Sequence, residues 1–216
     1  EAKYTTHRIR SCEWVLPGHP DRLADVVADI LVGTQTLWLP KGYSSIEAVV
    51  HLDRIYLTGR YSLRDGYSAP TISFFVNQVF ADAGYKKNGH WRGNSEDLTI
   101  GGNLQFEEMH EGQAESRKYS DDFCTVTGYA NQISGTQFMP VEHWLARQLA
   151  LNLFDEVQGP LGVCPNGKVF VEVEEVVTDS AVTYRLKSVS ASLVALPGVG
   201  ELSLRLVLEK HVSKLI

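Results

Sequence analysis

Apolar residues recur at helical spacing in the stretch that follows Pro20. Their positions match the i, i+3, i+4, i+7, i+8 pattern of a helix that buries one face. Pro20 itself suits the first helical position, where its missing N–H costs nothing. The sequence therefore predicts a helix from about residue 20, with a buried stripe of Leu23, Val26, Val27, Ile30 and Leu31.

Two strands, a helix and a third strand are predicted next. Residues 47–51 and 55–62 are rich in strand-forming side chains and flank a short polar turn, as in a hairpin. Residues 70–83 carry one apolar helical face and stop at Gly84, a residue that favours helix ends. Residues 98–106 are then expected to form a strand.

The same order recurs further along the chain. A helix is expected over residues 141–157, strands over 168–177 and 183–195, and a helix over 202–215. Helix, strand, strand, helix thus appears twice, which indicates two related α+β units. In the second copy the closing strand would begin where this sequence ends, so we expect another chain, or a continuation of this one, to cover the open sheet edge.

We expect the first α+β unit to span residues 11–130 and the second to span residues 131–216. The first unit holds a long polar segment from Gln105 to Asp122, rich in charged residues and poor in apolar ones. Such a segment is either a mobile lid or a plain exposed excursion. In the second unit the final strand is missing or is supplied by a partner.

Composition narrows the class of protein. The 216 residues include 20 basic and 26 acidic side chains, a net charge of −6, which argues against a nucleic-acid binder. No apolar run approaches the roughly 20 residues of a membrane helix, and the first ten residues do not resemble a signal peptide. The 3 cysteines are far apart, which favours reduced thiols in the cytoplasm over a disulfide framework or a zinc site.

The sharpest local signal is Gly18-His19-Pro20-Asp21 at the start of the first helix. Free N–H groups and the helix dipole attract anions there. His19 could donate to a phosphate oxygen, and Asp21 could hold Mg²⁺ that bridges phosphates. The alternative is an ordinary capped helix start with a histidine nearby.

Four segments together resemble the S-adenosylmethionine synthetase (methionine adenosyltransferase) family. Gly18–Asp21 resembles its GHPD core, and Gly128-Tyr129-Ala130 resembles its FGYA segment. Met139-Pro140, ahead of a helix, resembles its MP segment, and Pro165-Asn166-Gly167-Lys168 resembles its PDGK segment. The segments occur in the family's order and cover the chain from about Cys12 to Ile216.

The resemblance implies a fold, a reaction and cofactors. The family has three α+β units in a pseudo-threefold repeat, of which this sequence holds two. Its enzymes join ATP and L-methionine to give S-adenosylmethionine, phosphate and diphosphate, with Mg²⁺ and K⁺, at sites between two subunits. We therefore expect a transferase-like subunit of one-carbon metabolism that forms a homo- or hetero-oligomer with a synthetase-like chain.

The resemblance also implies roles for individual residues. His19 and Lys168 would contact the ATP phosphates as catalytic residues, and the loop from Gln105 to Asp122 lies where the family has its lid. The implied nucleotide-binding residues are His19, Asp122, Asn166 and Lys168; the implied metal ligands are Asp21 for Mg²⁺ and Glu47 for K⁺.

Departures from the family pattern favour other hypotheses. Arg60 stands where the family has a glutamate that holds the methionine ammonium, and an arginine would bind a carboxylate instead. Asn166 replaces an aspartate, and the third unit with its GGPxGDAGLTGRK segment is absent from this sequence. The chain could thus be a non-catalytic structural or regulatory subunit of a true synthetase, or could use a different second substrate that carries a carboxylate.

Each candidate residue also has a purely structural interpretation. Lys168 could be an edge-strand lysine, Glu47 a solvated strand residue, and Arg60 the partner of an acidic residue across a strand. The run Glu172, Glu174 and Glu175 reads as one solvated strand face rather than a metal site.

Overall fold

The computed structural model describes residues 4–38, 44–62, 69–85, 98–107, 125–156, 163–195 and 198–216. Four helices and two three-stranded sheets occur in these ranges. The chain divides into two compact units, Pro20–Val126 and the combination of Glu1–His19 with Thr127–Ile216. The α+β class predicted from the sequence is confirmed.

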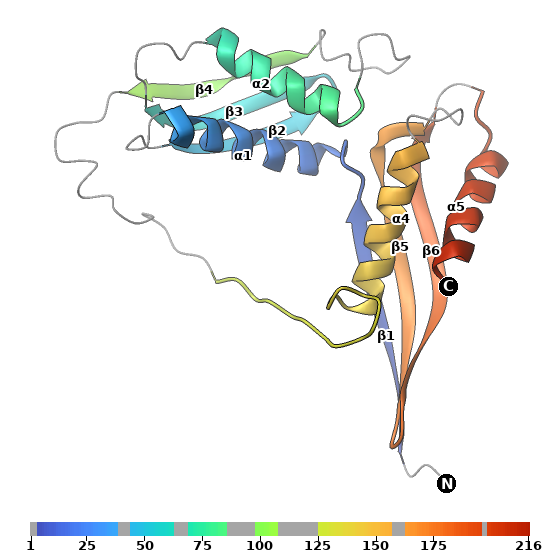
Figure 1. Ribbon diagram of the computed structural model, residues 1–216. Helices are drawn as coiled ribbons and strands as arrows, with labels where there is room; N and C mark the ends of the chain where they lie inside the picture. Colours follow the sequence, from blue (N-terminus) through green and yellow to red (C-terminus); the bar gives the residue numbers. More distant parts are fainter. Residues whose placement is uncertain are drawn as a thin grey trace. The chain divides into compact units, whose positions relative to one another are not determined.

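The unit Pro20–Val126 has two helices and a mixed sheet (Figure 1). Its elements are α1 (Pro20–Trp38), β2 (Ser44–His51), β3 (Arg54–Ser62), α2 (Ala69–Asp82) and β4 (Thr99–Glu107). The sheet order is β2-β3-β4, with β2 antiparallel and β4 parallel to β3. Alternate residues of β3 are buried, and the Tyr61 hydroxyl donates to the Leu31 carbonyl of α1 at 3.2 Å, which ties helix to sheet.

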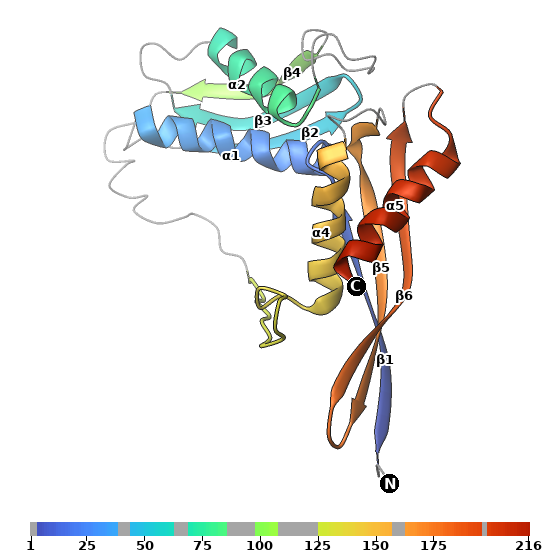
Figure 2. The same cartoon turned by 45° about the vertical axis from the view of Figure 1, so that its right-hand side comes forward.

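The other unit combines an N-terminal strand with the C-terminal part of the chain (Figure 2). Its elements are β1 (Thr5–Val15), α4 (Val141–Asp155), β5 (Val163–Thr178), β6 (Val182–Ala195) and α5 (Glu201–Leu215). The sheet order is β1-β5-β6, antiparallel throughout. Its core is apolar and draws on β1, α4 and β5: Cys12, Leu16, Leu145, Ala146, Leu149, Ala150, Leu153, Val169, Val171 and Val173.

The predicted repeat of helix, strand, strand and helix is present, as α1-β2-β3-α2 and α4-β5-β6-α5. Strand β1 was not predicted. Its segment is dominated by charged and polar side chains, and Cys12 is its one residue in the buried class. It forms a strand because all eleven of its residues stand in register with β5, from Thr5 opposite Thr178 to Val15 opposite Lys168.

The structural units and the predicted repeat boundaries are different divisions of the chain. Residues 11–19 group with the C-terminal part because β1 pairs with β5. The boundaries 11–130 and 131–216 stay a prediction about repeat units. Residues 108–124, and with them Asp122 and most of the lid-like loop, lie outside the described residues. None of the described helices has the length and apolar character needed to cross a membrane.

Candidate functional site

The pairing of β1 with β5 brings two of the sequence motifs together. Beyond the last register pair, Val15 with Lys168, the Leu16 N–H donates to the Gly167 carbonyl at 2.9 Å. The Gly18 N–H then donates to the Pro165 carbonyl at 3.1 Å. We call segments 16–19 and 165–168, joined by these bonds, the paired turn. Residues almost 150 positions apart in the sequence thereby form one local structure.

Gly18 has no room for a side chain in the paired turn. A Cβ atom built on it would stand 2.5 Å from the Pro165 Cβ and 2.8 Å from the Pro165 carbonyl carbon and oxygen. Leu16, two residues earlier, is fully buried and anchors the segment in the core. The glycine therefore serves close approach of two backbones, a role that the helix-cap interpretation of this motif did not include.

The paired turn carries three of the predicted nucleotide-binding residues. His19 follows Gly18 and closes a turn, its backbone N–H donating to the Leu16 carbonyl at 3.0 Å. His19 and Asn166 are both partly exposed, so both side chains can meet solvent or a ligand. The Lys168 side chain is 46% exposed, and its Nζ lies 3.0 Å from Glu13 Oε2. The arrangement offers an imidazole, an amide and an ammonium on two adjoining segments, donor types that suit phosphate oxygens.

Lys168 is not an edge-strand lysine. Strand β5 lies between β1 and β6, so the edge-protection interpretation is wrong. Its partner Glu13 lies on β1, two positions from the residue directly opposite Lys168. This diagonal, half-exposed ion pair contributes little to stability, and its carboxylate offsets the positive charge of Lys168.

The two predicted metal ligands lie in the other unit. Asp21 is exposed in the first turn of α1, and Glu47 is exposed on β2 opposite Thr58. Within the ranges that the structure describes, no group of three or more His, Cys, Asp or Glu side chains could hold a metal ion.

Arg60 lies in a polar row across the exposed face of the β2-β3-β4 sheet. The residues directly opposite it are Ser45 on β2 and Gln105 on β4, neither of them acidic. The Arg60 Nε donates to Gln105 Oε1 at 3.3 Å. Gln105, the start of the predicted lid loop, is thus a residue of β4.

The glutamate run on β5 does not form one solvated face. Glu175 is 6% exposed and lies on the helix-covered side, because side chains alternate along a strand. Its carboxylate accepts from Arg10 at 3.1 Å and from the Tyr184 hydroxyl at 3.2 Å, and Arg8 lies 3.6 Å away. The hydrogen bond from Arg10 to Glu175 raises the pKa of Arg10. Burial raises the pKa of Tyr184, and the hydrogen bond from its own hydroxyl to Glu175 raises it further. Sequence analysis missed this cluster because it missed β1.

A second buried carboxylate, Glu142, lies in the first turn of α4. It is 5% exposed, and its Oε2 has no hydrogen-bond partner among the described residues. Burial raises the pKa of the neighbouring Cys12 thiol to about 11, and the negative charge of Glu142 adds to this shift. Cys12 is therefore protonated at neutral pH and unsuited to nucleophilic chemistry.

No protein-family model matches the chain. Curated relatives do match. The S-adenosylmethionine synthase of Synechococcus sp. (strain RCC307) is 28% identical over 175 residues, covering 74% of this chain and 42% of the relative. That of Methylobacterium radiotolerans is 24% identical over 147 residues, covering 66% of this chain and 37% of the relative. The chain thus spans about two fifths of the length of the curated relatives it matches.

Among solved structures, the fold matches that of an unusual S-adenosylmethionine synthetase from Campylobacter jejuni. The TM-score is 0.76 at 16% identity, and the match covers 96% of this chain and 53% of that chain. The architecture described above is therefore that fold over nearly the whole length of the chain.

Proposed function

We propose that this chain, a divergent member of the S-adenosylmethionine synthetase family, binds the triphosphate of ATP at the paired turn. With a partner chain it then acts as a synthetase-like subunit that converts ATP and L-methionine into S-adenosylmethionine, phosphate and diphosphate. The observation that carries this proposal is the Gly18–Pro165 contact, which unites the two phosphate-related motifs in one turn.

The chemistry needs charge stabilisation more than acid–base catalysis. The methionine sulfur is already a good nucleophile, so attack on the ribose C5′ requires alignment and a stabilised triphosphate leaving group. In this chain the His19 imidazole would donate to a phosphate oxygen. Lys168 would supply positive charge. Asn166 would supply an amide donor, and because it is uncharged it would not repel the phosphates.

The metal roles rest on the family resemblance alone. Nucleotide-bound Mg²⁺ keeps several waters and needs only one or two protein carboxylates, so the exposed Asp21 suits that role. When bound, the ion would neutralise charge on the triphosphate. Glu47 remains the proposed K⁺-linked residue by resemblance, and we assign no step to that ion.

The test is binding of inorganic tripolyphosphate and a non-hydrolysable ATP analogue, measured by titration calorimetry with Mg²⁺. We expect His19→Ala and Lys168→Met each to weaken binding by about tenfold, the usual size for losing one charge-assisted hydrogen bond. His143→Ala, an exposed histidine on α4, is the matched control and should bind like the unchanged chain. Unchanged binding by His19→Ala would contradict the proposed site.

Activity is tested with a synthetase-like partner chain, ATP, Mg²⁺ and methionine. We expect the mixture to form S-adenosylmethionine or to cleave tripolyphosphate. We expect both activities to be lost when the chain carries His19→Ala. A complete mixture without either product would reject the catalytic proposal.

A non-catalytic role is the second candidate, and two contacts favour it. Lys168 is held by Glu13, and Arg60, in the place of the family's ammonium-binding glutamate, is held by Gln105. In that case the chain would bind a true synthetase and His19→Ala would leave the activity of the complex unchanged.

A further inference from the structure

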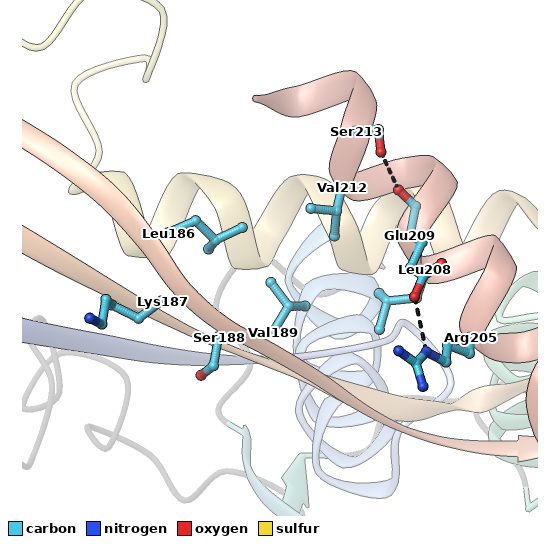
Figure 3. A pocket seen from close by; sticks show the side chains of 9 residues that line it. All are labelled: Leu186, Lys187, Ser188, Val189, Arg205, Leu208, Glu209, Val212 and Ser213. Atoms are coloured by element: carbon cyan, nitrogen blue, oxygen red, sulfur yellow. Dashed lines mark hydrogen bonds and ion pairs between the residues drawn. The ribbon is translucent and has the colours of Figure 1, made fainter.

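Two charged side chains of the unit that contains α4 and α5 differ from their neighbours in how they are satisfied. A groove of about 520 Å³ lies between β6 and α5 (Figure 3). In its wall the Arg205 Nε donates to Glu209 Oε1 at 2.9 Å, and the Ser213 hydroxyl donates to the Glu209 carbonyl at 2.8 Å. Arg10 and Glu142, by contrast, each bury one atom that no described residue bonds.

The two unbonded atoms have opposite hydrogen-bonding character. Arg10 Nε carries an N–H donor, and Glu142 Oε2 is an acceptor. Arg10 reaches Glu175 through a terminal nitrogen at 3.1 Å, which leaves its Nε–H without an acceptor in the described part of the chain. Glu142 is 5% exposed. Because a buried charged group without a hydrogen-bond partner is costly, each of these atoms requires a partner.

The fold brings Arg10 and Glu142 to the same place between β1 and α4. Cys12 of β1 and Leu145 of α4 belong to one core. Arg10 precedes Cys12 by two residues, about 6.6 Å along the same face of the strand. Glu142 precedes Leu145 by three residues, about 4.5 Å along the same stripe of the helix. Because β1 and α4 run in the same direction (Figures 1 and 2), both steps lead to the same level of the unit.

The electrostatics of Arg10 agrees with this placement. Its pKa is raised first by the hydrogen bond to Glu175 and further by the charges of Glu142 and Tyr129, although burial opposes the shift. Tyr129 is 68% exposed. Its hydroxyl is therefore within electrostatic reach of Arg10 while most of its side chain meets solvent.

Hydrogen-bond chemistry restricts what can serve both atoms at once. A single bridging group must accept from Arg10 Nε and donate to Glu142 Oε2. A metal cation has no lone pair to offer the N–H group, and an anion without a proton has nothing to donate to the carboxylate. Water and a hydroxyl group do both. We propose that a hydroxyl-type group, either a bound water molecule or the Tyr129 hydroxyl, bridges Arg10 Nε and Glu142 Oε2 and so joins α4 to β1.

The bridge involves two sequence motifs that the nucleotide site does not use. Gly128-Tyr129-Ala130 precedes Asn131, whose side-chain amide donates to the Met139 carbonyl at 2.9 Å. Pro140 stands just before α4, and Glu142 lies in the first turn of that helix. The bridge fastens this corner of the chain to β1, the strand that ends in the paired turn.

The test is hydrogen exchange of the arginine Nε–H groups in the full chain, measured by nuclear magnetic resonance without nucleotide. Arg8 is the internal reference, because it lies on the same face of β1 but its side chain is 60% exposed. The Arg10 signal is identified by its loss in Arg10→Lys. We expect the Arg10 Nε–H to exchange at least about tenfold more slowly than that of Arg8.

Substitutions identify the two ends of the bridge and its source. Glu142→Leu removes the acceptor and should bring exchange of the Arg10 Nε–H to the rate of Arg8, whereas Glu201→Leu, in the exposed first turn of α5, should not. Tyr129→Phe separates the two sources, with the exposed Tyr56→Phe as its control. Loss of protection in Tyr129→Phe alone identifies the tyrosine hydroxyl. Retained protection, with magnetisation transfer from a long-lived water to the Arg10 Nε–H, identifies water.

Three results would overturn the inference. The first is exchange of the Arg10 Nε–H as fast as that of Arg8 in the unchanged chain. The second is full protection in a folded Glu142→Leu variant. The third is protection that depends neither on Tyr129 nor on a bound water. The comparison of Arg10 with Arg8 and the result for Tyr129→Phe decide the matter even if Glu142→Leu does not fold.

Discussion

At the scale of single residues, a change of glycine to alanine should have opposite effects on stability at two positions. Gly18 faces Pro165 with no space for a Cβ atom, whereas Gly33 on α1 has nothing within 4 Å of the place a Cβ would take. Gly18→Ala should therefore lower the free energy of unfolding by about 1–3 kcal/mol through overpacking. It should also weaken tripolyphosphate binding, because the paired turn must open.

Gly33→Ala is the control for this prediction. An alanine in an exposed helix position should raise the free energy of unfolding by about 0.5–1 kcal/mol. Chemical denaturation of both variants gives the comparison. If Gly18→Ala is as stable as Gly33→Ala, the close packing at Pro165 does not hold.

The ion pair of Glu13 with Lys168 leads to a separate prediction about the paired turn. Its carboxylate pairs with Lys168 at 3.0 Å, so it competes with any phosphate for that ammonium. Glu13→Gln should tighten tripolyphosphate binding by about two- to fivefold, while stability changes by less than about 0.5 kcal/mol because the pair is half exposed. Titration calorimetry measures the first and denaturation the second. Weaker binding in Glu13→Gln would mean that Glu13 positions Lys168 rather than competing for it.

Short sequence motifs named the donors of the proposed site but not their packing. His19 could be named from the Gly18–Asp21 motif at a helix start, whereas Asn166 and Lys168 were named because Pro165–Lys168 resembles the PDGK segment of the synthetase family. The contact between Gly18 and Pro165 depends on the register of β1 with β5, which no short-range pattern encodes. Asp122 was predicted from the family resemblance alone; it lies outside the described residues and stays a prediction.

At the scale of elements, Glu175 ties β1, β5 and β6 together. It is nearly buried and bonds to Arg10 and Tyr184, with Arg8 close by. Glu175→Ala should lower the free energy of unfolding by about 1–3 kcal/mol, because it removes the carboxylate that accepts from Arg10 and Tyr184. Glu174→Ala is the control, because Glu174 lies on the open face beside the exposed His7 and should give a smaller loss. Denaturant titrations of the two variants decide, and equal losses would contradict the buried cluster.

Glu156, at the end of α4, makes a pH-dependent contact with α5. It accepts from His211 at 3.0 Å and from Lys210 at 3.3 Å. Burial acts to raise the Glu156 pKa, but these hydrogen bonds and charges outweigh it, so the pKa lies below its ordinary value of 4.5. The contact therefore contributes fully above about pH 4.5 and is lost as the pH falls through the lower, folded-state value.

Glu156→Gln tests this contact. At pH 7 the variant should be less stable by about 1 kcal/mol, and the difference should shrink toward zero in strong acid. Glu209→Gln, which removes an exposed pair with Arg205, should change stability by less than about 0.5 kcal/mol. A stability gap for Glu156→Gln that persists unchanged into strong acid would show that the contact is not ionic.

Elements with a local signature were predictable, and the one without it was not. Apolar periodicity predicted the helices and hairpins, because each of them turns a stripe or an alternating set of side chains toward the core. Strand β1 carries charges where a strand usually carries apolar residues. Its two arginines, Arg8 and Arg10, pair with Glu175, some 165 positions away on β5. A sequence window cannot contain both halves of such a pairing.

At the scale of the whole molecule, the two compact units differ in how the chain builds them. Residues 20–126 form one unit from a single stretch, with α1 and α2 covering one face of the β2-β3-β4 sheet. The other unit is discontinuous and needs β1 beside β5. Cys12 and Leu16, from the N-terminal stretch, belong to its core. Chain connectivity therefore predicts that the two parts differ in whether they fold when they are produced as separate fragments.

A fragment of residues 20–126 should fold by itself, with helical circular dichroism and a cooperative thermal transition, because its own residues supply its core: Leu23, Val27, Leu31, Ile55, Leu57, Tyr61 and Val76. A fragment of residues 127–216 should not, since it would expose one edge of β5 and the core surface that Leu16 covers. Adding a peptide of residues 4–19 to the second fragment should restore a cooperative transition. If the second fragment melts cooperatively without the peptide, β1 is an accessory strand, and the paired turn is not required to hold this unit together.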